Sequence, residues 1–225
     1  MNSRRASLIA EIESEVRQTR QALGFDRLAP AVRAALSAVP RHAFVPPAQR
    51  DLAYANHPLP IGNGQTISQP YIVAIMSQLL QCGAGERVLE LGTGCGYQAA
   101  VLAAMGLAVY TVEIVPELAQ RARTTLLELG YDQVQVRTGD GWQGWPEAAP
   151  FAGIIVTAAA APRIPKPLLE QLRPGGRLVI PVGAPEAIQD LAVYVKDASG
   201  QVKGHRVLPV RFVPVTGGLG RQDAP

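Results

Sequence analysis

The segment VLELGTGCGY (residues 88–97) places Gly92, Gly94 and Gly96 between two apolar runs. The run before them predicts a strand, and the run after them predicts a helix. Glycines at such a junction let a ligand approach the backbone closely, and the start of the helix favours an anionic or polar group. The dinucleotide-binding fingerprint is G-x-G-x-x-G, so the spacing G-x-G-x-G argues against NAD. By itself the segment could also be a simple glycine turn.

Two acidic residues follow at the ends of the next predicted strands. Glu113 lies 21 residues after Gly92 (113 − 92 = 21), which is the separation at which an acid accepts the hydroxyls of a ribose. Asp140, in TGDGW (138–142), follows the third predicted strand, where it could meet an adenine amino group or a neighbouring amide. Each acid alone could be a turn residue. Because the carboxyl ends of parallel strands meet at one edge of a sheet, the three segments together predict one ligand site.

The elements that must hold these residues alternate along the chain. Predicted strands cover 87–91, 107–114, 134–138, 151–157, 177–182, 190–196 and 206–215, and predicted helices cover 70–81, 97–105, 116–130 and 165–172. Near-continuous apolar strands are typical of a parallel sheet covered on both faces. We therefore expect an α/β fold with a doubly wound, mostly parallel sheet.

The first 70 residues predict a helical extension and then a loop. Apolar residues recur at helical spacing before a stop at Gly24: Leu8, Ile9, Ile12, Val16 and Leu23. Asp26 is a candidate cap for a second helix with Pro30 in its first turn. Prolines at 40, 46, 47, 58, 60 and 70 indicate a long irregular segment, whose apolar residues, Leu52 among them, should pack down. We expect one domain over 1–225, divided into 1–70, a sheet core over 71–218 and a loose tail over 219–225.

Composition excludes several classes of protein. The 225 residues are 48% hydrophobic and 17% charged, with a net charge of +3 and 5% aromatics. Scattered charges and few aromatics argue against a nucleic-acid partner. No apolar run approaches the about 20 residues of a membrane span, and no signal-peptide core follows Arg4 and Arg5, so we expect a cytoplasmic protein. Two cysteines, Cys82 and Cys95, give neither a disulfide framework nor a zinc spacing.

The order of glycine loop, strand-end acid and later acid resembles the class I methyltransferases. In that family the loop holds the methionine part of S-adenosylmethionine, the first acid holds the ribose and the later acid approaches adenine. The resemblance implies this cofactor, with S-adenosylhomocysteine as product. Matched residue by residue, the implied contacts are Gly92, Thr93, Gly94, Gly96, Glu113, Asp140 and Gly141.

The end of the fourth predicted strand, IIVTAAAAP (154–162), contains no acid, cysteine or amide. Methyltransferases that act on nucleic-acid amines have Asp or Asn followed by two prolines there. Those that act on cytosine C5 have Pro-Cys, and metal-dependent catechol enzymes have acids. The sequence therefore predicts no metal and no covalent nucleophile, and the methyl acceptor must already be nucleophilic.

Longer segments look like the protein-L-isoaspartate O-methyltransferase family. They are VPRHAFVP (39–46), PLPIGNGQTISQP (58–70), RVLELGTGCGYQ (87–98), GDGWQGW (139–145), PFAGIIVTAAA (150–160), LRPGGRLVIPVG (172–183) and VRFVPVTGG (210–218). The resemblance implies methyl transfer to the α-carboxylate of L-isoaspartyl residues in damaged proteins and peptides, as a repair reaction. It also implies that Thr66, Ile67, Ser68 and Thr216 contact the cofactor. In two departures, Asn56 stands where the family often has Asp, and Cys95 where Ser is common.

The segment IGNGQTISQP (61–70) carries amides and hydroxyls but no charge. An α-carboxylate has a pKa of about 3.3–3.7, so it is already an anion at pH 7 and needs no general base. A neutral hydroxyl can orient one of its oxygens and leave the other free to react. We assign this catalytic role to Ser68, as the resemblance also implies; the alternative is that Ser68 only caps the helix at 70.

Two rival functions stay open at this point. One is another small-molecule or polyketide-type methyltransferase, and the other is a catalytically idle module that binds the nucleotide or a peptide. The remaining chemical residues are expected to be structural: Cys95 as a small packed side chain, Trp142 and Trp145 as core or pocket wall, and the histidines His42, His57 and His205 without a direct role.

Overall fold

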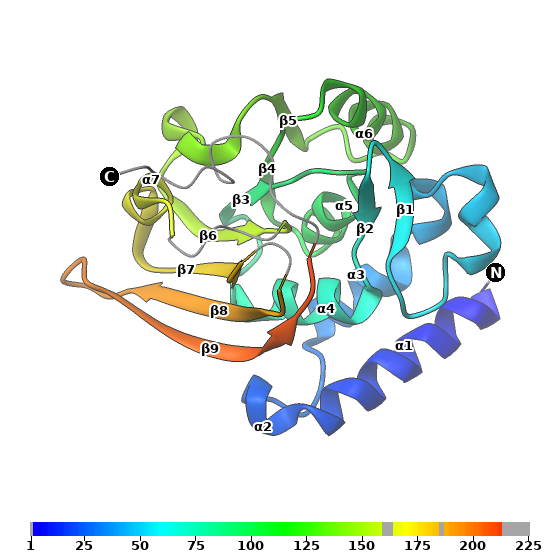
Figure 1. The fold of residues 1–225 in the computed structure, drawn as a ribbon, viewed down its shortest axis with the longest axis horizontal. Coiled ribbons are helices and arrows are strands. Elements are labelled where there is room, and N and C mark those ends of the chain that lie inside the picture. Colours follow the sequence, from blue (N-terminus) through cyan, green and yellow to red (C-terminus); the bar gives the residue numbers. More distant parts are fainter. Residues whose placement is uncertain (1, 159–163, 185–186, 213–225) are drawn as a thin grey trace.

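A seven-stranded sheet organises the computed structural model, which describes residues 2–158, 164–184 and 187–212 (Figure 1). Its order is β5-β4-β3-β6-β7-β8-β9. The strands are β3 (Arg87–Leu91), β4 (Ala108–Glu113), β5 (Gln135–Thr138), β6 (Phe151–Val156), β7 (Leu172–Val182), β8 (Gln189–Lys196) and β9 (Val202–Val210). The pairs from β5 to β7 are parallel, and β8 and β9 are antiparallel. The mostly parallel α/β sheet expected from the sequence is confirmed.

Helices cover the two faces of this sheet unequally. They are α1 (Asn2–Gln18), α2 (Arg20–Leu23), α3 (Pro30–Ala38), α4 (Pro70–Leu79), α5 (Tyr97–Ala104), α6 (Pro116–Glu128) and α7 (Lys166–Glu170). Side chains alternate between the faces, as in any strand: on β6, Ile155 joins the core with α1 and α3 to α6, whereas Ile154 joins a smaller cluster with Leu168 of α7. The 3₁₀ turns η3 (Gly141–Gln143) and η4 (Pro146–Ala148) complete the second, thinner layer.

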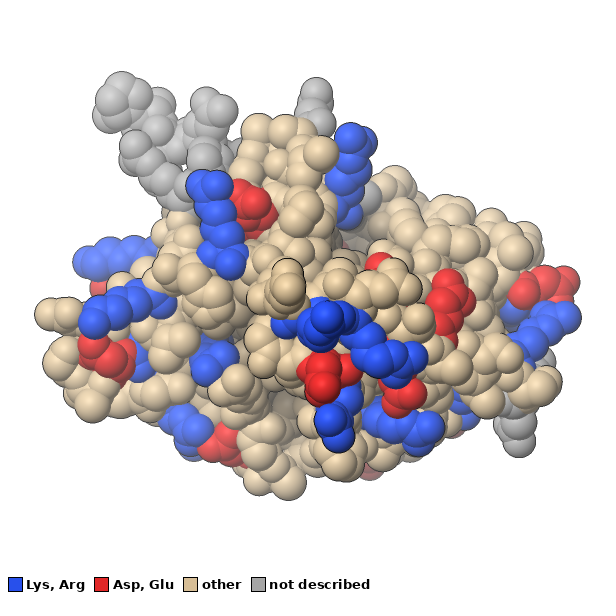
Figure 2. Space-filling view, turned by 90° about the horizontal axis from the view of Figure 1, so that it is seen from below, with Lys and Arg blue, Asp and Glu red and all other residues tan. Residues whose placement is uncertain are grey.

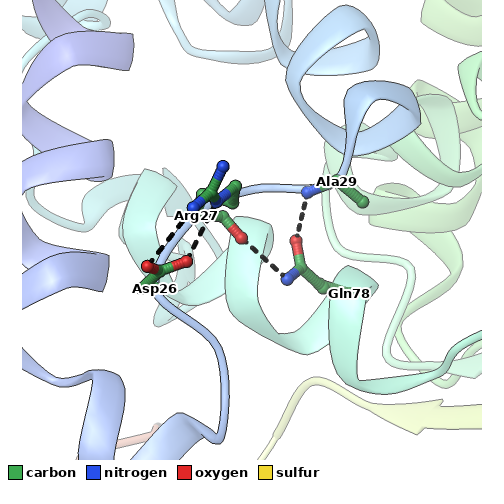
Figure 3. Close-up of polar contacts among 4 residues, drawn as sticks. All are labelled: Asp26, Arg27, Ala29 and Gln78. Carbon is green, nitrogen blue, oxygen red and sulfur yellow. Dashed lines mark hydrogen bonds and ion pairs between the residues drawn. The ribbon is translucent and has the colours of Figure 1, made fainter.

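The entry to α3 is held by a residue far away in the sequence. Gly24 ends α2 in the left-handed region (φ 77°), as expected. The prediction that Asp26 caps the next helix is wrong, because Asp26 instead pairs with Arg27 at 3.0 Å and α3 has no side-chain cap. Gln78 of α4 takes over: its Oε1 accepts from the Ala29 N–H at 2.7 Å, and its Nε2 donates to the Arg27 carbonyl at 3.1 Å (Figure 3).

The proline-rich segment 40–70 is more regular than the sequence suggested. It contains the 3₁₀ turns η1 (Arg41–Phe44) and η2 (Pro47–Leu52) and an antiparallel hairpin of β1 (Leu59–Gly62) and β2 (Gln65–Ile67). Asn63 and Gly64 at its tip have φ values of 53° and 69°, as a type I′ turn requires. The loop prediction was therefore wrong here. Leu52 is also 48% exposed rather than packed down.

Candidate active site

A cavity of about 840 Å³, counted to its open mouth, lies between the β1–β2 hairpin and the carboxyl ends of β3 and β4. Strand order reverses where β3 meets β6, and open α/β sheets bind ligands at such a switch point. Most of the predicted site residues line this cavity: Thr66, Ile67, Ser68, Gly92, Thr93, Gly94, Glu113 and Gly141. The structure therefore brings the hairpin and the strand ends together, although they are distant in sequence.

The glycine loop is fixed from β6. The hydroxyl of Thr157, just after β6, donates toward the carbonyls of Leu91 (3.1 Å) and Gly92 (2.6 Å). Gly92 has φ 96°, and a Cβ there would lie 2.7 Å from the Thr157 Oγ1. Both its conformation and this contact exclude a side chain, so the backbone of the loop stays bare toward the cavity.

The backbone N–H groups of the three glycines in this loop have partners within the protein. Gly92 donates to the Val112 carbonyl at 2.9 Å, and Gly96 donates to the Thr93 carbonyl at 2.8 Å. A Cβ on Gly96 would lie 3.3 Å from the Leu126 side chain of α6, so this glycine is explained by packing between α5 and α6. Its predicted contact with the cofactor stays a prediction. The loop at Gly92 thus offers a close backbone approach rather than free N–H donors.

Glu113 is held rigidly at the cavity wall. Its Oε2 accepts from the Gly94 N–H at 2.7 Å, and its Oε1 accepts from the Val115 N–H at 2.9 Å. The residue is 5% exposed. A carboxylate has about four lone-pair sites, so two remain for other donors. These sites fit the hydroxyls of a ribose, which is the role predicted for this acid.

The next strand end separates two residues that the sequence grouped together. Gly141 lines the cavity, and a Cβ on it would lie 2.9 Å from the Leu91 side chain. Asp140 is exposed, and its Oδ1 accepts from the Trp142 N–H at 2.9 Å at the start of η3. Asp140 therefore caps this turn, and its contact with adenine stays a prediction. Thr216 lies outside the described residues.

Sequence reasoning missed Glu90, a fully buried acid of β3 that lines the cavity. Its Oε2 accepts from the Thr111 hydroxyl at 2.6 Å, and that hydroxyl lies 2.6 Å from the hydroxyl of Thr93. Among the described residues its Oε1 has no partner. Desolvation, reinforced by the charge of Glu113, raises the pKa of Glu90 to about 8, so it is mostly neutral at pH 7. An acid inside the apolar run VLEL was the available signal.

Ser68 is half-buried at the cavity, and the alternative role as a helix cap is wrong. The N-cap of α4 is Gln69, which makes no side-chain capping hydrogen bond. The N–H of Tyr71 instead donates to Oδ1 of Asn56 at 3.0 Å, while Nδ2 of Asn56 donates to Glu15 at 2.8 Å. Asn56 thus connects α1 to α4. Ser68 does not cap the helix and lines the cavity instead.

These features belong together in one known family. The family model for protein-L-isoaspartate(D-aspartate) O-methyltransferase matches residues 14–220. The chain belongs to this family.

Curated relatives of the family cover nearly the whole chain. "Protein-L-isoaspartate O-methyltransferase 2" of Syntrophobacter fumaroxidans is 55% identical over 214 residues, which is 95% of this chain and 86% of that protein. The Gloeobacter violaceus protein-L-isoaspartate O-methyltransferase is 58% identical over 188 residues, 84% of this chain and 91% of that one. The sequence-based recognition of the family is confirmed.

Solved structures show the same fold. A protein-L-isoaspartate O-methyltransferase with 27% identity superposes with a TM-score of 0.82, over 96% of this chain and 67% of that chain. A putative family member from Plasmodium falciparum, in complex with S-adenosyl-L-homocysteine, gives a TM-score of 0.74 at 21% identity, over 91% of this chain and 97% of that one. The family fold therefore extends to the N-terminal helices.

The other reactive side chains singled out in the sequence either contact other parts of the protein or are unreactive at neutral pH. Burial raises the pKa of the Cys95 thiol to about 11, so it is not a nucleophile at neutral pH. Nδ1 of His42 lies 2.8 Å from the Tyr54 hydroxyl, and Trp145 stacks edge-on against Tyr110. In the described ranges no three His, Cys, Asp or Glu residues gather as metal ligands. No helix there is long and apolar enough to cross a membrane.

Proposed function

We propose that this chain transfers a methyl group from S-adenosylmethionine to the α-carboxylate of L-isoaspartyl residues in damaged proteins and peptides. The observation that carries the proposal is the uncharged segment 65–68, which faces the glycine loop and Glu113 across one cavity. One wall suits a nucleoside cofactor, and the other suits a carboxylate that needs orientation rather than activation. The family and the curated relatives of this chain are both named for this activity.

The cavity residues fit the cofactor. Glu113 would hold the ribose, and Gly92 and Gly141, where a Cβ would collide with Thr157 and Leu91, leave their backbone open to the cofactor. When bound, S-adenosylmethionine supplies an electrophilic methyl group on a sulfonium. The protein contributes alignment and the removal of water around the reacting atoms.

The hairpin side of the cavity suits an anionic acceptor, because the carboxylate of Glu113 lies on the cofactor wall and is bound by two backbone N–H groups. None of the described residues that line it is Lys or Arg, so no fixed cation would hold the carboxylate away from the methyl group. Glu90 is mostly neutral at pH 7, because its pKa is raised to about 8, and it therefore repels the acceptor little. Ser68 would donate its hydroxyl to one carboxylate oxygen and leave the other free. The backbone amide nitrogen of the following residue then attacks the methyl ester, methanol leaves and a succinimide forms. Water partly reopens this ring to normal aspartate, which is the repair.

Proteins rather than nucleic acids are the proposed partners. Figure 2 shows blue and red side chains interspersed on one face of the molecule rather than gathered in a basic stripe. Nucleic-acid-binding domains typically cluster Lys and Arg on one face. A cytoplasmic location, expected from composition, completes the proposal.

A pair of synthetic peptides tests the function directly. The purified chain is incubated with S-adenosylmethionine and a peptide that contains L-isoaspartate, and the matched control contains L-aspartate at the same position. Ester formation on the isoaspartyl peptide alone supports the proposal. Methylation of small acids but not of the peptide would indicate another methyltransferase, and calorimetric cofactor binding without any transfer would indicate an idle binding module.

A further inference from the structure

The hairpin that covers the cavity contains a β-bulge. Its register pairs Leu59 with Ile67, Pro60 with Thr66 and Gly62 with Gln65, so Ile61 is the extra residue. A bulge leaves its extra residue outside the ladder of hydrogen bonds. The carbonyl of Ile61 therefore needs a partner from elsewhere in the protein.

Arg121 of α6 supplies that partner. Its Nη2 donates to the Ile61 carbonyl at 2.7 Å, although the two residues are 60 positions apart in the sequence. The next residue, Gly62, has φ 92°, and a Cβ there would lie 3.6 Å from the same Nη2. The guanidinium thus lies directly against the bulge. This contact joins the hairpin to helix α6.

The side chain of Ile61 makes a second connection, to the glycine loop. It is 2% exposed, and its Cδ1 would lie 3.5 Å from a Cβ placed on Gly94. Helix α6 begins directly after Val115, whose N–H holds Glu113 at the cavity wall. One helix therefore supports both the ribose-binding acid and the covering hairpin.

We infer that Arg121 is a positioning residue that holds the β1–β2 hairpin, and with it Ser68, closed over the cofactor cavity. The kinetic part of this inference rests on the proposed function, whereas the structural part does not. Arg121 does not line the cavity itself, so it acts through the hairpin. Arg121 is an exposed residue, so its removal should affect hairpin closure more than global stability.

The test replaces Arg121 by Met, which keeps an apolar stem but removes the donors, and by Lys, which restores a single cationic donor group. The control is Arg87→Met. Nη1 of Arg87 donates to the Ala148 carbonyl at 2.8 Å, at the amino end of β3 and away from the cavity. Amide hydrogen exchange over 59–69 reports closure, and calorimetry with S-adenosylhomocysteine reports binding. Steady-state kinetics with the isoaspartyl peptide separate KM from kcat.

For Arg121→Met we expect exchange over 59–69 to accelerate and the dissociation constant for S-adenosylhomocysteine to rise, each about five- to tenfold. KM for S-adenosylmethionine should rise in parallel, and Arg121→Lys should recover part of the loss. Arg87→Met should leave exchange in this segment unchanged. Unchanged exchange and affinity in Arg121→Met, or equal changes in the control, would overturn the inference. If wild type proves inactive on the peptide, the proposed function fails, while the exchange and binding measurements still decide the role of Arg121.

Discussion

Replacing Glu90 by Gln should change how the stability of the cofactor-free protein depends on pH. Glu90 is fully buried, and desolvation raises its pKa from 4.5 to about 8. Between these two values the unfolded chain loses the proton while the folded protein keeps it. The stability that Glu90 contributes is therefore complete below pH 4.5 and is lost as the pH rises toward 8.

The size of the effect follows from one proton. Each pH unit inside this window lowers the free energy of unfolding by roughly 1.4 kcal/mol. For a chain of this length, 1 kcal/mol corresponds to roughly 2–4 °C in melting temperature. Gln cannot ionise, so this contribution should vanish in Glu90→Gln. Its amide leaves a buried donor near the position of the unpartnered Oε1, which lowers the absolute melting temperature but not its slope.

Differential scanning fluorimetry of both proteins from pH 5 to pH 8 measures the two slopes. The quantity of interest is the melting temperature of the wild type minus that of the variant, because contributions from other groups cancel in this difference. We expect the difference to fall steadily across the range. Parallel curves would refute the reasoning, because they would mean that Glu90 does not stay protonated in the folded protein.

Three further predictions concern the site and its support. Ser68→Ala should lower turnover on an isoaspartyl peptide by about 10- to 150-fold with little change in melting temperature, because one hydrogen bond to a charged group is lost; a protein that keeps its turnover but melts lower would place Ser68 in a structural role. Glu113→Ala should raise the dissociation constant of the cofactor, measured by calorimetry, at least about tenfold. An unchanged affinity would mean that this acid does not contact the ribose. Asn56→Asp should melt lower at pH 7.5 than at pH 4.5 relative to wild type, because it sets a second carboxylate against Glu15, whose pKa burial already raises; a pH-independent difference would argue against that repulsion.

The sheet and the glycine loop could be predicted from the sequence because their signals are local. Apolar runs such as 87–91 and 151–156 have the length and composition of buried strands, and the glycines mark where the first one ends. The hairpin at 59–67 was missed, although Asn63-Gly64 is a typical hairpin turn. Its strands have only four and three residues, and the first contains Pro60, so the alternation was too short to reveal them. The last strand was misplaced for a related reason: β9 runs from Val202 to Val210, so it begins earlier than the apolar run at 206–215.

The unpredicted features depend on partners distant in the sequence. Gln78 replaces the cap expected from Asp26, yet it reaches α3 across 49 positions. Glu90 becomes neutral because the covered sheet desolvates it, an effect that outweighs the hydrogen bond from Thr111, which lowers its pKa. No local pattern in the sequence reveals this burial. The connection from Arg121 to the hairpin has the same origin. Such contacts exist only once the topology has brought the elements together.

The position of the cavity has a consequence for the damaged proteins themselves. It lies between the β1–β2 hairpin and the strand ends, so an acceptor residue must enter under the hairpin, which a folded surface cannot do. An isoaspartate within a rigid strand or helix of its parent protein must therefore leave that structure before it can be esterified. Its rate of repair should fall about tenfold for every 1.4 kcal/mol that local opening costs. The enzyme would then act first on mobile loops and termini, and the folding stability of each substrate would set its order of repair.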